Sequence, residues 1–352
     1  MDDEAALAAA RGVAADVLAP QATAAERDGV PRASIDALAA VGLLAVAGPA
    51  ELGGLSPAAG REVAELLAGA SPDAWFVWMQ HHLPVRLVTE TSNVAARERL
   101  LPELCAGRML AAVAFSHLRR PHPGVHATRV GRGWRIQGTV PWLTSWGLAD
   151  VVALGALTDD GDVLFAMVPL GADAPPGLVA TPALELASMQ GTRTVGLQLN
   201  GVVVPDDAVV LREPTPRWRE EDALRAANVV PATFGIANAA LAGLRAAVGA
   251  PGAEQVGEVA DELAAALAAT RERAYALMDD APADQAVGER IALRAQALGL
   301  TLRATAADIA VHGGRAMGAE HPAQRQARAA LFLLVQAQTP LLRAATLARL
   351  RP

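Results

Sequence analysis

The 352-residue chain contains no lysine, so all thirty of its basic residues are arginine. A lysine side chain is required for a pyridoxal Schiff base, an aldolase-type imine, a P-loop and the catalytic site of a protein kinase. The composition therefore excludes these four kinds of chemistry.

Cysteine is almost absent as well. With Cys105 alone, the chain has no internal disulfide and no cysteine-based zinc or iron–sulfur site. The net charge of −7 argues against non-specific nucleic-acid binding. No apolar run reaches the roughly 18 residues of a membrane span, and the acidic, alanine-rich start does not resemble a secretory signal. We expect a cytoplasmic protein with neither a nucleic-acid nor a membrane partner.

Hydrophobic periodicity divides the chain into three parts. Residues 1–108 have apolar positions at helical spacing, with Ser56-Pro57 as a helix cap and first turn and Gly107 at a helix end. Residues 109–212 form short runs, several rich in valine and leucine, that are bounded by glycine, proline and aspartate. Residues 213–352 return to long helical stretches. These patterns predict an α+β protein with an N-terminal helical domain, a middle antiparallel β domain and a C-terminal helical bundle.

Two other functions are considered and set aside. The segment "HGGRAMG" from His312 to Gly318 resembles the oxyanion loop of esterases, but no G-x-S-x-G nucleophile motif accompanies it. We interpret it as a turn between two helices. A nicotinamide-binding unit is not supported either, because G-x-G-x-x-G is absent.

Three histidines, His117, His122 and His126, lie at spacings of five and four residues. They could offer imidazoles to a metal ion. Pro121 and Pro123 prevent a shared helical face, however, and no carboxylate lies between the histidines. We therefore favour loop histidines that line a ligand cleft, and we predict no metal site.

The block "GWRIQGTVPWLTSWGLADVV" contains three of the six tryptophans in the chain. Trp142 and Thr144 are two residues apart and would share one face of a strand. An aromatic plane beside a hydroxyl can hold a flat heterocycle by stacking and a hydrogen bond. A place in the core of the sheet is the equal alternative.

Four segments, taken in order, resemble the acyl-CoA dehydrogenase superfamily. They are "GVPRASIDALAAVGLLAVAGPAELGGLSP", "GWRIQGTVPWLTSWGLADVVALGAL", "SMQGTRTVGLQLNGVVVPDDAVV" and "HGGRAMGAEHPAQRQARAALFLLVQAQTP". The resemblance implies an N-terminal helical domain, a middle β domain and a C-terminal four-helix bundle. It also implies FAD bound between the β domain and the bundle, in a homo- or hetero-oligomer. The implied activity is an oxidoreductase acting on CH–CH groups, in which a carboxylate removes the α-proton of an acyl thioester and flavin N5 accepts the β-hydride.

The resemblance assigns flavin contacts by position. Trp142 and Thr144 would contact the isoalloxazine, and Ser116 falls where a flavin-binding serine or threonine belongs. Gly313 and Gly314 would approach the adenosine end, with Thr339 near it.

The catalytic base departs from the family pattern. The usual Glu-Gly-Thr triplet is replaced by Ala337-Gln338-Thr339, and alanine cannot transfer a proton. Some family members carry the base on an earlier bundle helix, at a position that falls near Arg225. Close to it lie the weak candidates for a displaced base, which are Glu220, Glu221 and Asp222. An acidic helix start, favoured by the helix dipole, explains these residues more simply.

Two binding motifs also depart from the pattern. The family's Arg-x-x-Phe-Gly segment, which reaches the FAD pyrophosphate of the partner subunit, is missing, and Arg245 would be only a weak substitute. "RRPHPGVH" replaces the Gly-Ser-Asp of the substrate loop.

Three functions remain in competition. The first is a divergent flavin enzyme acting on an acyl thioester. The second is a non-catalytic partner subunit of a heteromeric acyl-CoA dehydrogenase, and the third is a reduced-flavin-dependent monooxygenase of the same superfamily. In all three, we expect "LFLLVQAQTP" to form a core helix through Leu331, Leu334 and Val335, with Ala337 at the vacated position of the base.

Overall fold

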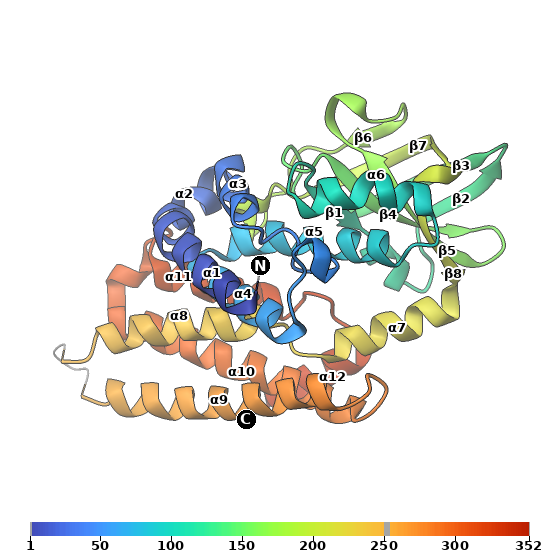
Figure 1. Cartoon of the computed structure of the whole chain (residues 1–352). Coiled ribbons are helices and arrows are strands. Elements are labelled where there is room, and N and C mark those ends of the chain that lie inside the picture. The colour runs from blue at the N-terminus through green and yellow to red at the C-terminus, as the bar shows by residue number, and fades with distance from the viewer. Residues whose placement is uncertain (1, 250–253, 352) are drawn as a thin grey trace.

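The computed structural model describes residues 2–249 and 254–351, and it confirms the predicted α+β architecture. Figure 1 shows N-terminal helices, a β domain beside them, and a layer of long C-terminal helices beneath both. The N-terminal helices are α1 (Asp3–Val13), α2 (Ala19–Asp28), α3 (Arg32–Ala40), α4 (Pro57–Ala70), α5 (Pro72–Glu90) and α6 (Val94–Cys105), with a π-helical turn, η1 (Ala14–Leu18), between the first two and a short 3₁₀ turn, η2 (Ala50–Leu52), before α4.

The starts and ends of these helices follow local chemistry. Ser56 caps α4 by accepting a hydrogen bond from the Ala59 amide, and Ser71 caps α5 in the same way, each with proline at the next position. The predicted Ser56-Pro57 cap is thus confirmed. Gly107, with a φ of 70°, follows the end of α6 and adopts the left-handed conformation that glycine tolerates best.

The β domain contains one eight-stranded sheet. Its strands are β1 (Ala111–Ala114), β2 (Val125–Val130), β3 (Gly133–Leu143), β4 (Val151–Thr158), β5 (Asp162–Pro169), β6 (Leu178–Ala180), β7 (Val195–Pro205) and β8 (Val209–Pro214). The order is β6-β7-β3-β2-β4-β5-β8, with β1 also paired to β4. Most pairings are antiparallel as predicted, but β1 and β2 both run parallel to β4.

Short 3₁₀ turns connect several of these strands. They are η3 (Ser116–Arg119), η4 (Gly171–Asp173), η5 (Gln190–Thr192) and η6 (Asp206–Ala208). Strands β4 and β5 are buried along almost their whole length, because one core lies within the sheet layer and a second lies between the sheet, α5 and α6. Burial on both faces explains why these strands read as unbroken apolar runs.

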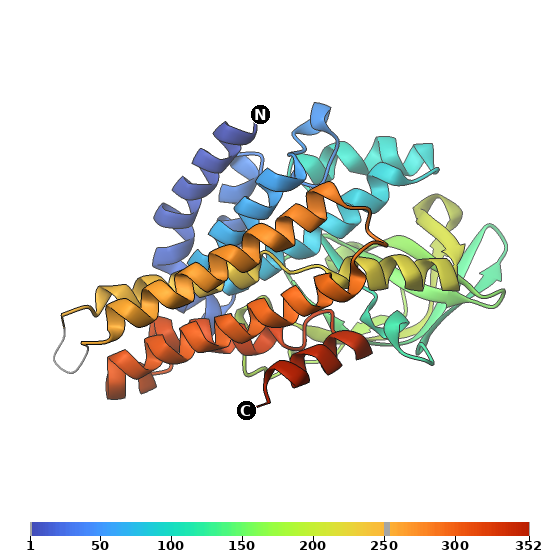
Figure 2. The same ribbon diagram turned by 90° about the horizontal axis from the view of Figure 1, so that it is seen from below.

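The C-terminal part contains α7 (Thr215–Ala227), α8 (Ala232–Ala246), α9 (Val256–Asp280), α10 (Val287–His312), α11 (Pro322–Leu333) and α12 (Pro340–Arg349), with a 3₁₀ turn, η7 (Gly313–Met317), after α10. Figure 2, which views the molecule from below, shows α9 and α10 running side by side in front of the N-terminal helices. The span Thr215–Ala246 is long and apolar enough to cross a membrane by length and composition only. Because 61% of its apolar window is buried inside the protein, it has the character of a core helix.

The predicted apolar face near the C-terminus is wrong in phase. Leu331 is 57% exposed and Val335 is 65% exposed, whereas Leu333 is buried; of the three predicted residues, only Leu334 packs against the core, and it is partly buried. The helix also ends at Leu333 rather than continuing to Pro340. Because apolar residues occur on every side of this segment, periodicity could not select the face that packs, and Ala329, Ala330 and Leu333 provide it.

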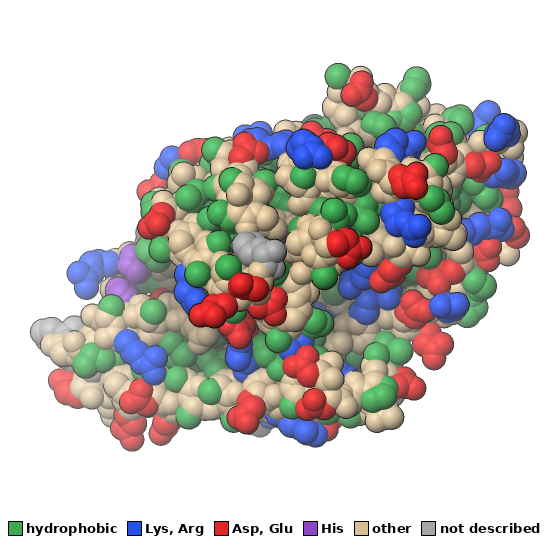
Figure 3. Space-filling model, viewed as in Figure 1, with side chains coloured by type: hydrophobic (Ala, Val, Ile, Leu, Met, Phe, Trp, Pro, Cys, Tyr) green, Lys and Arg blue, Asp and Glu red, His purple; other side chains and the backbone are tan. Residues whose placement is uncertain are grey.

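Charged side chains are spread over the surface. Figure 3 shows acidic and basic side chains intermixed over one face of the molecule. On that face, no broad basic area offers a footprint for a nucleic acid.

Candidate functional site

The flavin-contact residues predicted from the sequence lie at the end of β3. Trp142 is 47% exposed, whereas Thr144 is buried and its hydroxyl lies 3.2 Å from that of Thr194. Strand β3 ends at Leu143, so the strand alternation does not extend to Thr144. An exposed indole beside a buried hydroxyl is a surface on which a planar ring can stack.

Three non-glycine residues with positive φ gather beside Thr144. Ser145 has a φ of 72°, and Met189 and Arg193, which flank η5, have φ values of 56° and 49°. Each such residue costs about 1–3 kcal/mol and persists only where its surroundings fix it. Here the Ser145 amide donates to the Thr192 carbonyl at 2.9 Å, and the Trp146 amide donates to the Arg193 carbonyl at 3.3 Å.

Ser116 lies where η3 follows β1, and η3 packs against β3 and β4. The Ser116 hydroxyl is buried without a hydrogen-bond partner, and the same is true of the Ser145 hydroxyl. Buried hydroxyls normally have partners, so these two are available to a ligand or to water.

The vacated base position lies in a tight turn after α11. Ala337 has a left-handed φ of 49°, and the carbonyl of its neighbour Gln336 accepts a hydrogen bond of 2.7 Å from Arg294. Arg294 is only 2% exposed, and its second nitrogen donates to the Ala226 carbonyl at 2.5 Å, at the end of α7. One buried guanidinium therefore joins α10, α7 and the turn at Ala337.

Burial, together with the nearby charge of Arg119, lowers the pKa of Arg294 to about 10. Arg294 remains protonated near neutral pH, so its positive charge contacts the carbonyl of Gln336, the residue before Ala337. Burial also lowers the pKa of Arg86 on α5, and the charge of Arg225 on α7 adds to that effect. The local field favours a negatively charged ligand or intermediate and disfavours a carboxylate with an elevated pKa.

The candidate displaced bases are engaged elsewhere or exposed. Asp222 is buried and forms a two-point ion pair with Arg119 at 2.7 and 2.9 Å. Glu221 pairs with Arg217 at 3.0 Å and with Arg225 at 3.5 Å. Glu220 is exposed. Sequence reasoning missed Arg119, in the η3 turn, and Arg294, on α10, because nothing local distinguishes an arginine that packing buries from a surface charge.

Gly313 and Gly314 are exposed in η7, whereas Thr339 caps α12 by accepting a hydrogen bond from Leu342 at 3.2 Å. Arg294 on α10 holds the turn that precedes Thr339 through the Gln336 carbonyl. Gly313 lies 19 residues after Arg294, at the far end of α10, which corresponds to about 28 Å of helix. A single chain thus does not bring the glycine pair and Thr339 together. Arg245, the weak substitute for the lost arginine motif, pairs with Asp261 at 3.1 Å.

The three loop histidines do not converge. His117 is buried with its Nε2 at 2.8 Å from the Gly155 carbonyl, while His122 and His126 are exposed. Burial lowers the pKa of His117 to about 4. Within residues 2–249 and 254–351, no group of three histidine, cysteine, aspartate or glutamate side chains has the arrangement of a metal site.

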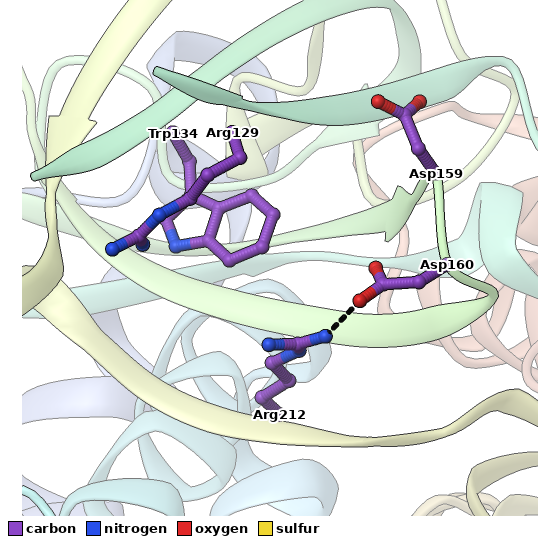
Figure 4. A pocket seen from close by; sticks show the side chains of 5 residues that line it. All are labelled: Arg129, Trp134, Asp159, Asp160 and Arg212. Atoms are coloured by element: carbon purple, nitrogen blue, oxygen red, sulfur yellow. Dashed lines mark hydrogen bonds and ion pairs between the residues drawn. The ribbon is translucent and has the colours of Figure 1, made fainter. Parts of the chain in front are cut away.

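A surface hollow of about 620 Å³ lies elsewhere in the β domain (Figure 4). The guanidinium groups of Arg129 and Arg212 lie 5.1 and 5.3 Å from the ring of Trp134. Each arginine is also ion-paired, Arg129 with Asp206 and Arg212 with Asp160. These contacts hold strand ends together, and none of the predicted flavin residues lines the hollow.

Comparisons with known proteins agree with the fold described above. The family described as "Acyl-CoA dehydrogenase, N-terminal domain" matches residues 1–108. No curated protein sequence matches the chain.

Three solved structures illustrate the similarity in fold. Butyryl-CoA dehydrogenase from Megasphaera elsdenii is 19% identical, with 99% of this chain and 97% of that chain covered and a TM-score of 0.81. A probable acyl-CoA dehydrogenase from Mycobacterium abscessus is 20% identical, with coverages of 99% and 98% and a TM-score of 0.78. A glutaryl-CoA dehydrogenase from Mycobacterium smegmatis, in complex with FADH2, is 16% identical, with coverages of 98% and 93% and a TM-score of 0.80. Residues 1–108 thus match the family of acyl-CoA dehydrogenase N-terminal domains, and the whole chain shares its fold with these solved structures.

Proposed function

We propose that this chain is an acyl-CoA dehydrogenase-like flavoprotein that binds FAD against the end of β3 and receives an acyl thioester or a related small molecule. We further propose that no residue at position 337 removes the α-proton. When bound, FAD would supply a hydride acceptor for oxidation of a CH–CH group. The chain's own residues would stack on the flavin through Trp142 and donate hydrogen bonds from Ser116 and Ser145.

One observation carries this proposal. Ala337 lies in a turn that Arg294 holds by the adjacent Gln336 carbonyl, and an ordered turn without a carboxylate at position 337 supports the loss of the base. The buried carboxylate of Asp222, within α7, is held in a two-point ion pair with Arg119, so both of its oxygens are engaged inside the chain.

A non-catalytic partner subunit of a heteromeric acyl-CoA dehydrogenase is the second candidate. It is favoured by the separation of Gly313 from Thr339, because a second chain would be needed to complete a site that uses both. Exposed apolar side chains on α11, α12 and the turn between them offer a surface for such a chain. They are Leu331, Val335, Leu341, Leu347 and Leu350.

The flavin site predicts the effect of removing the exposed indole. Trp142→Ala should weaken FAD binding about tenfold or more, because ring stacking contributes roughly 1–3 kcal/mol. Since Trp142 is largely exposed, its loss should change the free energy of unfolding by less than about 1 kcal/mol. The measurement is a titration of the purified chain with FAD, followed by flavin fluorescence, alongside urea unfolding.

Trp142→Phe, which keeps an aromatic plane, and Val203→Ala, which alters an exposed β7 side chain, are the controls. Both should bind FAD within about threefold of the wild type. Equal affinity of Trp142→Ala and the wild type would exclude this site. A chain that binds only reduced flavin would instead point to the monooxygenase function, and one that binds FAD only with a homologous chain would point to the partner subunit.

A further inference from the structure

A buried aspartate joins the N-terminal helices to the β domain. Asp73, in the first turn of α5, is 2% exposed and accepts a hydrogen bond of 2.9 Å from the Gly191 amide of η5. The Gly191 carbonyl in turn accepts a hydrogen bond of 2.9 Å from the Val30 amide. A side chain at position 191 would place its Cβ 1.9 Å from the Ala25 carbonyl oxygen, so only glycine allows this approach.

The same turn holds the end of β3. The Thr192 carbonyl of η5 accepts from the Ser145 amide. The Thr192 hydroxyl lies 3.0 Å from that of Thr194, which in turn lies 3.2 Å from that of Thr144. Hydrogen bonds on both sides of the η5 backbone thus link Asp73 to Thr144 and Ser145, which lie two and three residues beyond Trp142.

Backbone strain shows that η5 must be held from outside. Met189 and Arg193, on either side of it, both have positive φ, and so does Ser145. Left-handed non-glycine residues persist only when surrounding contacts fix them. Asp73 supplies one such contact from a helix outside the β domain.

We propose that Asp73 is a positioning residue for the flavin-contact end of β3, and that it acts by fixing the η5 turn through the Gly191 amide. The link to flavin rests on the proposed function. The positioning of Ser145 and Thr144 is independent of that function, because its hydrogen bonds form within the chain without flavin.

The charges around Asp73 define how this contact responds to pH. Burial raises the pKa of the Asp73 carboxyl to about 7, and the charge of Glu26 on α2 raises it too. The Gly191 amide and the charges of Arg325 and Arg328 on α11 act in the opposite direction, and Arg328 also pairs with Glu26 at 2.8 Å.

The sign of the pH dependence follows from linkage. In the folded state the Asp73 carboxyl keeps its proton up to about pH 7, whereas an unfolded aspartate loses it near pH 4. Relative to states that expose the carboxyl, the folded arrangement around Asp73 is therefore most stable below about pH 4 and loses this stability as the pH rises to about 7, although the Gly191 hydrogen bond itself favours the ionised carboxyl.

Hydrogen exchange on the flavin-free chain tests the proposal directly. Asp73→Ala should raise the amide exchange rates of residues 144–146 and 189–193 about tenfold or more. Loss of the carboxyl leaves the buried Gly191 amide without an acceptor, and an unsatisfied buried donor changes an opening equilibrium by a factor of this order. Asp73→Asn, which keeps an acceptor oxygen, should stay within about threefold of the wild type. Exchange rates in the wild type, corrected for intrinsic pH effects, should rise between about pH 4 and 7, and those of Asp73→Asn should not.

Asp36→Asn, an exposed change on α3, is the control and should alter neither segment. If Asp73→Ala does not fold, the contrast in pH dependence between the wild type and Asp73→Asn decides the question. Unchanged exchange in Asp73→Ala, or equal pH profiles of wild type and Asp73→Asn, would overturn the proposal. FAD titration of the same variants is read separately, so a chain that binds no flavin would refute the proposed function without deciding this one.

Discussion

Replacing Ala337 by glutamate should give the FAD-loaded chain a measurable exchange of the α-protons of a bound acyl thioester with solvent deuterium. The wild type should show none above the rate without protein. A positioned general base contributes about 10²–10⁴-fold. We expect the lower part of that range, because the charge of Arg294 would lower the pKa of the new carboxylate and weaken it as a base.

The left-handed backbone at position 337 also affects this variant. A side chain larger than alanine at a φ of 49° adds strain of about 1 kcal/mol. Ala337→Gln is therefore the matched control, because it introduces the same size and strain without a base. Two results would show that position 337 is not where the family's base was lost. One is α-proton exchange by Ala337→Gln at the rate of Ala337→Glu, and the other is rapid α-proton exchange by the wild type.

Arg294→Met should lower the free energy of unfolding by about 2–4 kcal/mol. The methionine fills part of the space but leaves the carbonyls of Ala226 and Gln336 without their donor, and a buried unpaired polar group costs about 1–3 kcal/mol. Relief of the cost of burying the guanidinium offsets part of the loss. The measurement is urea unfolding of the flavin-free chain.

Arg303→Met is the matched control, since Arg303 lies on the same helix but is exposed. Its free energy of unfolding should stay within about 0.5 kcal/mol of the wild type. If Arg294→Met were as stable as Arg303→Met, the guanidinium would not be what joins α7 to the turn at Ala337.

The order of helices and strands could be predicted from the sequence because two signals are local. These are the spacing of apolar residues and the capping, glycine and proline residues at the ends of elements. Ser56-Pro57 and Gly107 mark helix boundaries by their own chemistry. Strand β8 extends to Pro214, two residues beyond the predicted end of the β domain, because proline can close an edge strand as well as begin a connector. The parallel pairing of β1 and β2 with β4 depends on the crossing of distant segments, which a local pattern does not encode.

The roles of Trp142, Thr144 and Ala337 come from the resemblance of short motifs and stay predictions. The hydrogen bonds of Arg294 and Asp73 join segments 42 and 118 residues apart, so nothing local indicates them. Both side chains look like ordinary surface charges until packing buries them.

The central claim is that the flavin-contact surface is kept and the base is lost. The most direct test is anaerobic mixing of the FAD-loaded wild-type chain with a saturated acyl-CoA in deuterium oxide, following both the visible flavin absorbance and deuterium at the α-carbon. We predict a bound, unbleached flavin and no deuterium incorporation. Rapid bleaching of the flavin together with α-deuteration would contradict the claim, because it would require a working base in this chain.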